Sequence, residues 1–344
     1  MLWNYPYFDH EVCRLHEQIA AFLLKANNEG NSPRSFSTAR HCCPELRQRC
    51  ESATKLKSKL RAFYKAFVSL NPSDRRKVFK AFQDVNAIDA QLENRRQRYP
   101  LNGLPKAIRA PTKNLFLYLY KDALGAGGMV KAHWEKFYES IQRKGCPFCA
   151  IEPLHYSGFY KQDYDHLLCK DIYPFAAVNM RNLVPIGRDC NTIFKKSKDI
   201  LMKNGIRRRA FKPFAPSGVQ IKIALTGSRL PTAADKKGRW KVTVTPRRQE
   251  VATWIDLFET PRRYEKEVLQ SSAVNWIGEF RDVAVLAEPS GGWTIQRLRG
   301  FLGRYAKTFN SLDYSERHFL KAPFYDFLHK LGSPDFLKPL LNSL

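Results

Sequence analysis

The chain has 344 residues, of which 44% are hydrophobic and 13% aromatic, and its 58 lysines and arginines exceed its 32 acidic residues by 26 charges. This apolar content excludes wholesale disorder, because disordered chains combine high charge with few aromatic residues. The length predicts about two or three domains. No apolar run approaches the roughly 20 residues of a membrane helix, and the first residues do not have the pattern of a signal peptide. We therefore expect a globular, cytoplasmic protein that does not bind membranes.

The net charge predicts a polyanionic partner. A surplus of 26 positive charges attracts polyanions and repels itself until they bind. Nucleic acid is the leading candidate, because each neutralised phosphate releases counterions. Solubility alone needs far less net charge, and no lipidation motif points to a membrane surface.

Residues 1–144 are expected to form a helical N-terminal region. Over residues 55–68, apolar side chains recur at helical spacing. The sequence Asn71-Pro72 predicts a break that caps a second helix. Further helices are expected near residues 115–123 and 130–142.

The pattern changes after residue 144. Residues 146–190 are rich in turns, and a basic, helix-like stretch follows over residues 192–203. Residues 219–225 and 240–245 alternate with a period of two, which predicts a pair of half-exposed strands. Helices return from about residue 261. The sequence thus predicts a mostly helical α+β chain with four regions, residues 1–144, 145–205, 206–260 (basic and β-rich) and 261–344.

The sequence Cys146-Pro147-Phe148-Cys149 has three interpretations: half of a zinc site, a redox pair, or chance. A redox pair of the thioredoxin kind should open a helix inside a βαβ unit. Here Ala150-Ile151-Glu152-Pro153 follows instead. Zinc is therefore favoured over redox chemistry.

Asp165 and His166 are adjacent, with a carboxylate beside an imidazole. On an extended segment neighbouring side chains point to opposite faces, so one can hold a metal while the other handles a proton. Asn191 offers a second oxygen at the start of the lysine-rich stretch. Oxygen ligands of this kind suit Mg²⁺, which keeps waters and phosphate oxygens as its other ligands.

These elements together resemble the HNH branch of the His-Me finger nucleases. The resemblance rests on Asp165-His166, then Asn182-Leu183-Val184-Pro185, then Cys190-Asn191, with the Cys-x-x-Cys pair upstream. It covers about a sixth of the chain, from near residue 146 to near residue 199. It implies a central ββα-metal core over residues 145–205, similar to a treble clef, in which a β-hairpin and a helix surround one divalent metal.

The resemblance also implies a role for each residue. His166 would be the general base that activates water, and Asp165 and Asn191 would hold Mg²⁺ or another divalent ion such as Mn²⁺. Asn182 would orient the loop so that the imidazole faces the water. This chemistry fits phosphodiester hydrolysis, in which an imidazole takes a proton and a metal stabilises developing charge. Phosphate contacts are expected from four basic residues, Arg188, Lys195, Lys196 and Lys198.

One departure from the family concerns zinc. Zinc-binding members carry a second Cys-x-x-Cys, and Gly187 stands where its first cysteine should be. Three thiols remain for a structural Zn²⁺, those of Cys146, Cys149 and Cys190. Either His155 or Cys169 supplies a fourth ligand, or the zinc has been lost, and the sequence leaves these alternatives open.

Two basic stretches flank the motif. Residues 195–212 hold eight basic residues and one acidic residue, and residues 229–248 hold seven and one. We interpret them as a track for phosphates, which positions a substrate without reading its sequence. The layout resembles HNH effector subunits of bacterial anti-phage systems of the Septu and retron type, which implies an ATPase partner and antiviral defence.

The sequence therefore predicts an Mg²⁺-dependent HNH endonuclease acting on DNA. Two alternatives stay open. The first is a nuclease that cleaves RNA, such as tRNA, because phosphate is common to both substrates. The second is a non-catalytic nucleic-acid-binding protein that keeps a zinc knuckle.

Overall fold

The computed structural model describes residues 3–29, 33–156, 164–216, 219–232, 235, 238–311 and 317–342. The chain is mostly helical, at 60%, with small antiparallel hairpins, which confirms the expected mostly helical α+β class. None of the helices in these ranges has the length and apolar character needed to cross a membrane.

The chain forms two compact units. The large unit comprises Asn4–Gln142 and Leu154–Gly218, and the small unit comprises Met1–Trp3, Arg143–Pro153 and Val219–Leu344. This grouping follows contacts in space, and the four regions expected from the sequence stay a prediction.

Eight α-helices of the large unit precede its hairpins. They are α1 (Glu11–Asn27), α2 (Thr38–His41), α3 (Pro44–Ser52), α4 (Thr54–Val68), α5 (Pro72–Asn86), α6 (Ile88–Leu92), α7 (Lys106–Tyr118) and α8 (Met129–Ser140). The helix expected over residues 55–68 is confirmed as α4. The expected cap of α5 is also confirmed, because the Asn71 side chain accepts a hydrogen bond from the backbone N–H of Asp74 at 2.8 Å.

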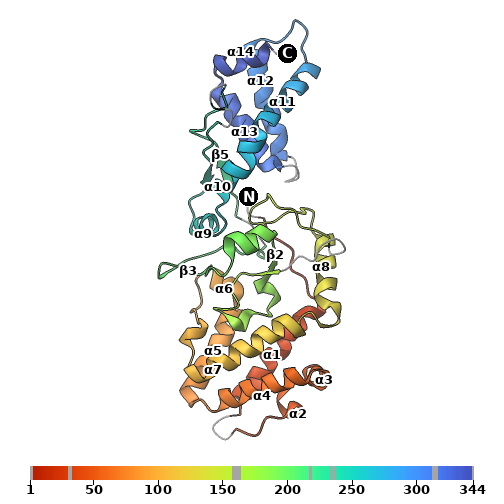
Figure 1. Cartoon of the computed structure of the whole chain (residues 1–344), viewed down its shortest axis with the longest axis vertical. Helices are drawn as coiled ribbons and strands as arrows, with labels where there is room; N and C mark the ends of the chain where they lie inside the picture. The colour runs from red at the N-terminus through yellow and green to blue at the C-terminus, as the bar shows by residue number, and fades with distance from the viewer. Residues whose placement is uncertain are drawn as a thin grey trace. The chain divides into compact units, whose positions relative to one another are not determined.

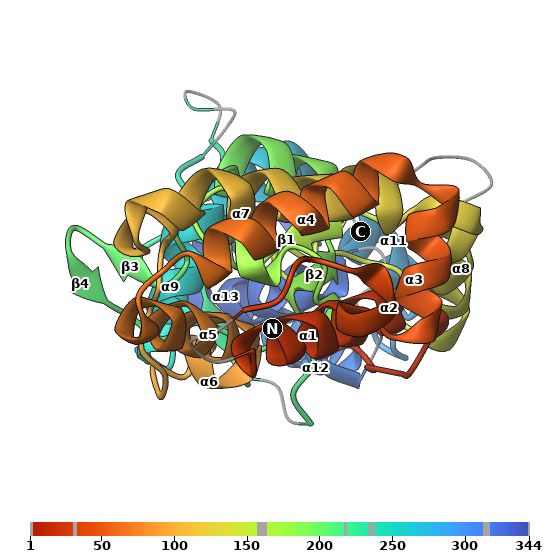
Figure 2. The same ribbon diagram turned by 90° about the horizontal axis from the view of Figure 1, so that it is seen from below.

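The core of the large unit is helical and aromatic. Helix α1 packs against α3, α4 and α5, and α4 lies beside α7 in both ribbon views (Figures 1 and 2). Phe63 and Phe67 of α4 are fully buried in this core, as the apolar spacing of α4 predicts, and so is Phe116 of α7. Helix α7 continues into a π-helical turn, η2 (Leu119–Ala123). The helix expected near residues 115–123 is thus divided between α7 and η2.

A small buried hairpin follows the helices of the large unit. Strand β1 (Tyr164–His166) pairs antiparallel with β2 (Leu183–Pro185), so that Asp165 lies opposite Val184 and His166 opposite Leu183. All six residues are buried. Short 3-10 turns connect the strands, η4 (Pro174–Ala176) and η5 (Met180–Asn182), and the π-helical turn η6 (Cys190–Lys195) comes after β2.

The helix expected over residues 192–203 is wrong. The helical segment ends at Lys195, because Lys196 takes a positive φ of 50° that no right-handed helix allows. A second hairpin then begins, formed by β3 (Met202–Lys203) and β4 (Ile206–Arg207). The Asp199 side chain accepts from the backbone N–H of Leu201 at 3.0 Å, a local bond that competes with helix formation.

The small unit contains the third hairpin and the remaining helices. Strand β5 (Lys222–Ala224) pairs antiparallel with β6 (Thr243–Thr245), which confirms the expected strand pair in a shorter form. Lys236 and Lys237 of the expected phosphate track lie outside the described residues. The helices are α9 (Gln249–Phe258), α10 (Thr260–Arg263), α11 (Gln270–Leu286), α12 (Ile295–Ser311), α13 (His318–Leu331) and α14 (Pro334–Leu341), with the π-helical η7 (Tyr264–Leu269) before α11. Helices α12 and α13 lie side by side (Figure 1).

Candidate active site in the large unit

A cavity of about 790 Å³ lies within the large unit and contains most of the predicted site. Asp165 and His166 of β1 line it, as do Asn191, Lys195 and Lys196 from η6 and its end. These residues are separated by as many as 31 positions in sequence. The β1–β2 pairing and the turn into η6 bring them to one wall.

The His166 imidazole is held in one orientation. Its Nε2 lies 3.0 Å from the carbonyl oxygen of Ala177, and its ring centre lies 4.3 Å from that of Tyr120. A carbonyl can only accept, so Nε2 carries the proton and Nδ1 of the neutral ring keeps its lone pair. Among the described residues no group hydrogen-bonds Nδ1.

Burial decides the charge of His166. The side chain is 5% exposed, and desolvation lowers its pKa to about 3, with further lowering by Lys170 and Lys195. The ring is therefore neutral at pH 7 and can accept a proton at Nδ1. The negative charge of a bound phosphate would favour the protonated form and raise this pKa.

Asn182 fixes the loop that follows β1. Its Oδ1 accepts from the backbone N–H of Leu168 at 2.7 Å, and its Nδ2 donates to the carbonyl oxygens of Leu168 and Ala176, each at 3.1 Å. The side chain is fully buried. It therefore orders the chain between His166 and Ala177, whose carbonyl holds the imidazole.

Asp165 is buried beside a lysine. Lys195 Nζ donates to Asp165 Oδ1 at 3.1 Å and to the carbonyl oxygen of His166 at 2.6 Å. It also lies 3.0 Å from Asp165 Oδ2, which is buried and accepts no hydrogen bond. Burial raises the pKa of the Asp165 carboxyl, and the Lys195 ammonium opposes that shift.

The oxygen atoms at this wall fit a divalent ion such as Mg²⁺. Asp165 Oδ2 is a buried acceptor that lacks a donor, and the Asn191 amide lines the same cavity. One or two protein oxygens, completed by waters and phosphate oxygens, are the ligand set that Mg²⁺ prefers. The ammonium of Lys195 already lies at that carboxylate, a feature that the sequence did not predict.

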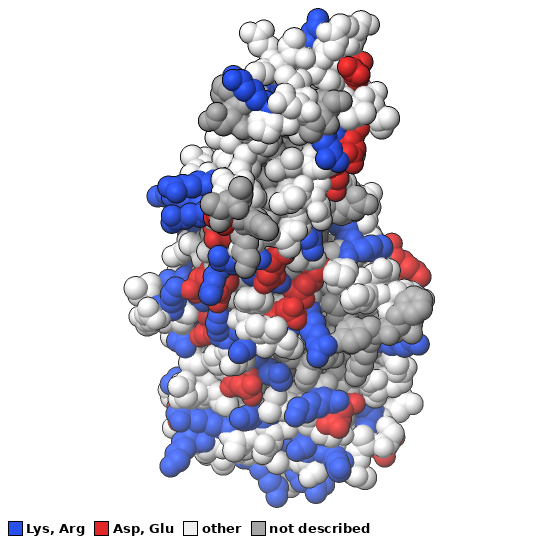
Figure 3. All heavy atoms as spheres, turned by 45° about the horizontal axis from the view of Figure 1, so that its top comes forward, with Lys and Arg blue, Asp and Glu red and all other residues white. Residues whose placement is uncertain are grey.

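The predicted phosphate contacts divide into two kinds. Arg188, Lys196 and Lys198 are exposed, whereas Lys195 is 1% exposed and bound to Asp165. Arg188 and Lys198 do not line the cavity. On the face shown in Figure 3, lysines and arginines are spread widely, with acidic residues among them.

Sequence reasoning missed several residues of the cavity wall, among them Tyr120, Lys121, Lys131 and Lys170. Tyr120 packs its ring on His166, and the Lys170 ammonium lies 5.8 Å from the centre of the Tyr120 ring. Lys170 follows His166 by four residues, and this proximity was the one available signal. Nothing in the local pattern connects residues 120–131 with β1.

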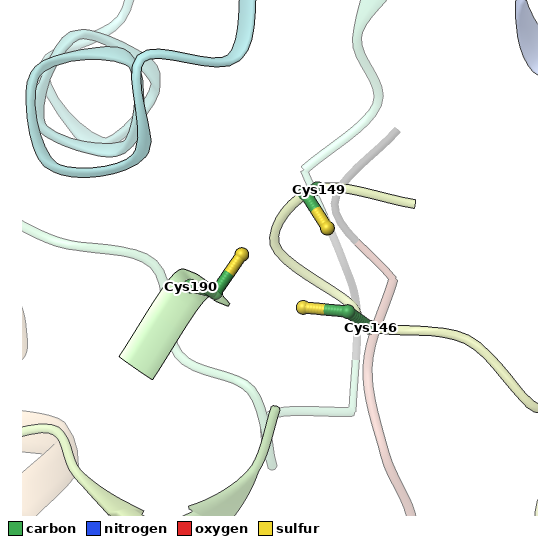
Figure 4. Close-up of side chains that lie close together, drawn as sticks. All are labelled: Cys146, Cys149 and Cys190. Carbon is green, nitrogen blue, oxygen red and sulfur yellow. The ribbon is translucent and has the colours of Figure 1, made fainter. Parts of the chain in front are cut away.

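Cys146 and Cys149 belong to a short turn in the small unit. The backbone N–H of Ala150 donates to the carbonyl oxygen of Cys146 at 2.9 Å, and the two sulfur atoms lie within 4.8 Å of each other. The Tyr264 hydroxyl donates to the carbonyl oxygen of Cys149 at 3.0 Å. Figure 4 shows both side chains on this turn, and Cys190 at the start of η6.

Cys146 and Cys149 are two buried thiols of the small unit that could bind a metal such as zinc, and the Cys190 thiol of the large unit is also buried. Thiolate ligands suit Zn²⁺, which takes four ligands in structural sites. Among the described residues, neither His155 nor Cys169 belongs to a group of possible metal ligands. Cys169 instead lines the cavity of the large unit.

No protein-family model, curated protein or solved structure matches the chain.

Proposed function

We propose that this protein is a metal-dependent HNH-type endonuclease that hydrolyses phosphodiester bonds, with DNA as the favoured substrate. The observation that supports it most is the buried β1–β2 hairpin. It presents a neutral His166 with one fixed tautomer beside the Asp165 carboxylate in a single cavity. The proposal also includes an ATPase partner and a role in antiviral defence, which rest on the resemblance in domain layout to HNH effector subunits of anti-phage systems.

In this proposal His166 is the general base. Nδ1 removes a proton from the attacking water, whose oxygen bonds to phosphorus while the bond from phosphorus to the leaving oxygen breaks. The leaving oxygen takes a proton from solvent, and the imidazolium returns its proton to solvent. A divalent ion held by Asp165 and Asn191 would stabilise the charge that develops on the phosphate and on the leaving oxygen.

The lysines of the cavity would bind the substrate. Lys121, Lys131, Lys170 and Lys196 line its wall, and Asp165 is the one acidic residue among the described residues there. Such a cationic cavity attracts the phosphate backbone of DNA and RNA alike. Cavity charge therefore supports a nucleic-acid substrate and leaves the choice between DNA and RNA to experiment.

The zinc knuckle is a separate part of the proposal. A structural Zn²⁺ on Cys146, Cys149 and Cys190 would contribute to folding. Its Cys146–Cys149 turn is supported by Glu152, whose carboxylate binds the Arg263 guanidinium at 3.1 Å. Metal analysis of the purified protein should find about one zinc per chain. Cys146→Ser should lower that content, and Cys43→Ser, at a half-buried cysteine outside the group, should not.

Cleavage assays test the nuclease directly. Plasmid DNA and total RNA are incubated with the wild type, with His166→Ala and with His41→Gln, in Mg²⁺ or in EDTA. We expect Mg²⁺-dependent cutting that His166→Ala reduces by about 10²–10⁴-fold. His41→Gln is the control, because His41 is a fully buried imidazole that does not line the cavity.

The outcomes separate the candidate functions. Cutting of RNA alone would favour the RNA nuclease, and cutting that His166→Ala leaves intact would exclude His166 as the base. Tight DNA binding without cutting, also after addition of a candidate ATPase partner, would favour the non-catalytic zinc-knuckle protein. The buried thiols of Cys146 and Cys149 on one turn are the observation that supports this second candidate.

A further inference from the structure

Lys195 is a buried lysine whose ammonium is paired with the buried carboxylate of Asp165. Its ammonium is 1% exposed and lies within 3.1 Å of both carboxylate oxygens of Asp165 and within 2.6 Å of the carbonyl oxygen of His166. The other lysines of the cavity wall make no ion pair with Asp165. Lys195 is therefore the counter-ion that compensates this buried carboxylate.

The ammonium lies where a metal ion would have to approach. A divalent ion coordinated by Asp165 would bind oxygens that Lys195 Nζ contacts at about 3 Å. Two cations on one buried carboxylate repel each other strongly, because the interior screens charge weakly. The ion and the ammonium therefore compete for Asp165.

The surroundings allow the lysine to leave. Lys195 Nζ lies 3.0 Å from Asp165 Oδ2 but directs its hydrogen bond to Oδ1, so among the described residues Oδ2 has an ionic contact and no hydrogen bond. The cavity of about 790 Å³ lies beside it, and the lysine stem has four flexible carbons. Lys195 can therefore move into the cavity without leaving the large unit.

We propose that Lys195 is the resident counter-ion of Asp165, and that a divalent cation binds this carboxylate by displacing the Lys195 ammonium into the cavity. The inference rests on the metal site of the proposed function. It adds that the metal-free protein is held in a charge-compensated state by its own lysine. Displacement would place the ammonium in the cavity, where a substrate phosphate would bind.

The first test measures the reactivity of Lys195 in the wild-type protein. The chain is treated with an amine-acetylating ester, with and without Mn²⁺, and acetylation at each lysine is followed by mass spectrometry. We expect Lys195 to be protected without the ion and to react about tenfold faster or more with it, since the displaced amine is no longer buried. Lys196, its exposed neighbour, is the internal control and should react equally in both conditions.

The second test measures Mn²⁺ affinity by electron paramagnetic resonance. Lys195→Met keeps the length of the stem without its charge, and we expect it to bind Mn²⁺ about tenfold tighter or more than the wild type. Lys196→Met is the matched control and should bind within about twofold of the wild type. Asp165→Asn should lose the site in both backgrounds.

These measurements can overturn the inference separately from the nuclease. Unchanged Lys195 protection at saturating Mn²⁺ would contradict it, as would equal affinities of the wild type and a folded Lys195→Met. Failure of Mn²⁺ to bind either protein would also contradict it. If Lys195→Met does not fold, the labelling result decides. Displacement of Lys195 without cleavage of any nucleic acid would support the inference while contradicting the proposed function.

Discussion

The β1–β2 and β5–β6 hairpins are alike in size and opposite in surroundings. Each pairs two antiparallel three-residue strands. Every residue of β1 and β2 is buried, whereas the outer residues of β5 and β6 are exposed and only their central residues are half-buried. Although β1 is buried, it carries two polar side chains, Asp165 and His166, whereas the Lys222 side chain of β5 is exposed.

The difference lies in the charged and polar groups that the β1–β2 hairpin buries. Burying a carboxylate and an imidazole costs free energy unless each has a partner, and Lys195 and the Ala177 carbonyl supply those partners. An exposed lysine such as Lys222 needs no such partner. Side chains that are costly to bury and individually compensated occur most often at functional sites.

The largest expected difference comes from removing the lysine of η6 that is bound to β1, compared with removing the lysine that β5 carries. Lys195→Met leaves Asp165 buried without its counter-ion, and we expect the free energy of unfolding to fall by about 3–5 kcal/mol. Urea denaturation at pH 7 measures it. A loss below about 1 kcal/mol would mean that the Asp165–Lys195 pair is not a buried ion pair in solution.

Asn182→Ala should have the next largest effect. It removes the partner of the buried backbone N–H of Leu168 and one donor each to the carbonyl oxygens of Leu168 and Ala176, at a cost of about 2–4 kcal/mol. Cleavage should also fall, because the Ala177 carbonyl would no longer hold His166 in place. The counterpart near the other hairpin is Ser228→Ala, which removes the hydroxyl that accepts from Lys241 N–H and should cost about 1 kcal/mol.

The β1–β2 hairpin should also make stability depend on pH. His133 of α8 shares a 2.6 Å hydrogen bond with the Tyr164 hydroxyl of β1, and burial lowers the His133 pKa to about 4, aided by His10 and Lys136. An unfolded histidine titrates near 6.5. The unfolded chain therefore binds the proton first as the pH falls, so this contribution is complete above about pH 6.5 and is lost between about pH 6.5 and 4.

The size of this loss is up to about 3 kcal/mol, since each pKa unit corresponds to about 1.4 kcal/mol. Denaturation with urea at pH 7.5 and at pH 4 measures it. His133→Phe should flatten this part of the pH profile, and an unchanged profile in that variant would assign the dependence to other groups.

The smallest effect is expected in the exposed hairpin. Lys222→Met should change the free energy of unfolding by less than about 0.5 kcal/mol, because its side chain is exposed and substitutions at such positions are nearly neutral. Measured beside Lys195→Met under the same conditions, it is the matched control for loss of a lysine. Equal losses of unfolding free energy in the two variants would contradict the view that Lys195 compensates a buried charge and Lys222 does not.

Much of the local structure could be predicted from the sequence. The apolar spacing of α4, the Asn71 cap of α5 and the period-two pattern of β5 and β6 are each determined by neighbouring residues. The candidates Asp165, His166 and Asn191 were also found from sequence, since a short motif carries their order, and the fold places all three at one cavity.

Other features could not be predicted because they depend on residues distant in the chain. Nothing in the lysine-rich stretch shows that Lys195 is buried on Asp165 while Lys196 and Lys198 are exposed. The tight η6 turn and the positive φ of Lys196 decide that, and they replace the longer helix that the composition indicated. Tyr120, Lys121 and Lys131 reach the cavity from the segment between α7 and the start of α8, more than 30 residues before β1.

The sequence by itself therefore determined the local elements and the chemical groups of the candidate site. Tertiary structure alone decided which charges are buried and what compensates them. The physical reason is that helix and strand patterns follow from interactions over a few residues, whereas the burial of a charge depends on all the segments that pack around it. At Asp165 that packing buries Lys195 against the carboxylate and leaves the neighbouring lysines, Lys196 and Lys198, exposed.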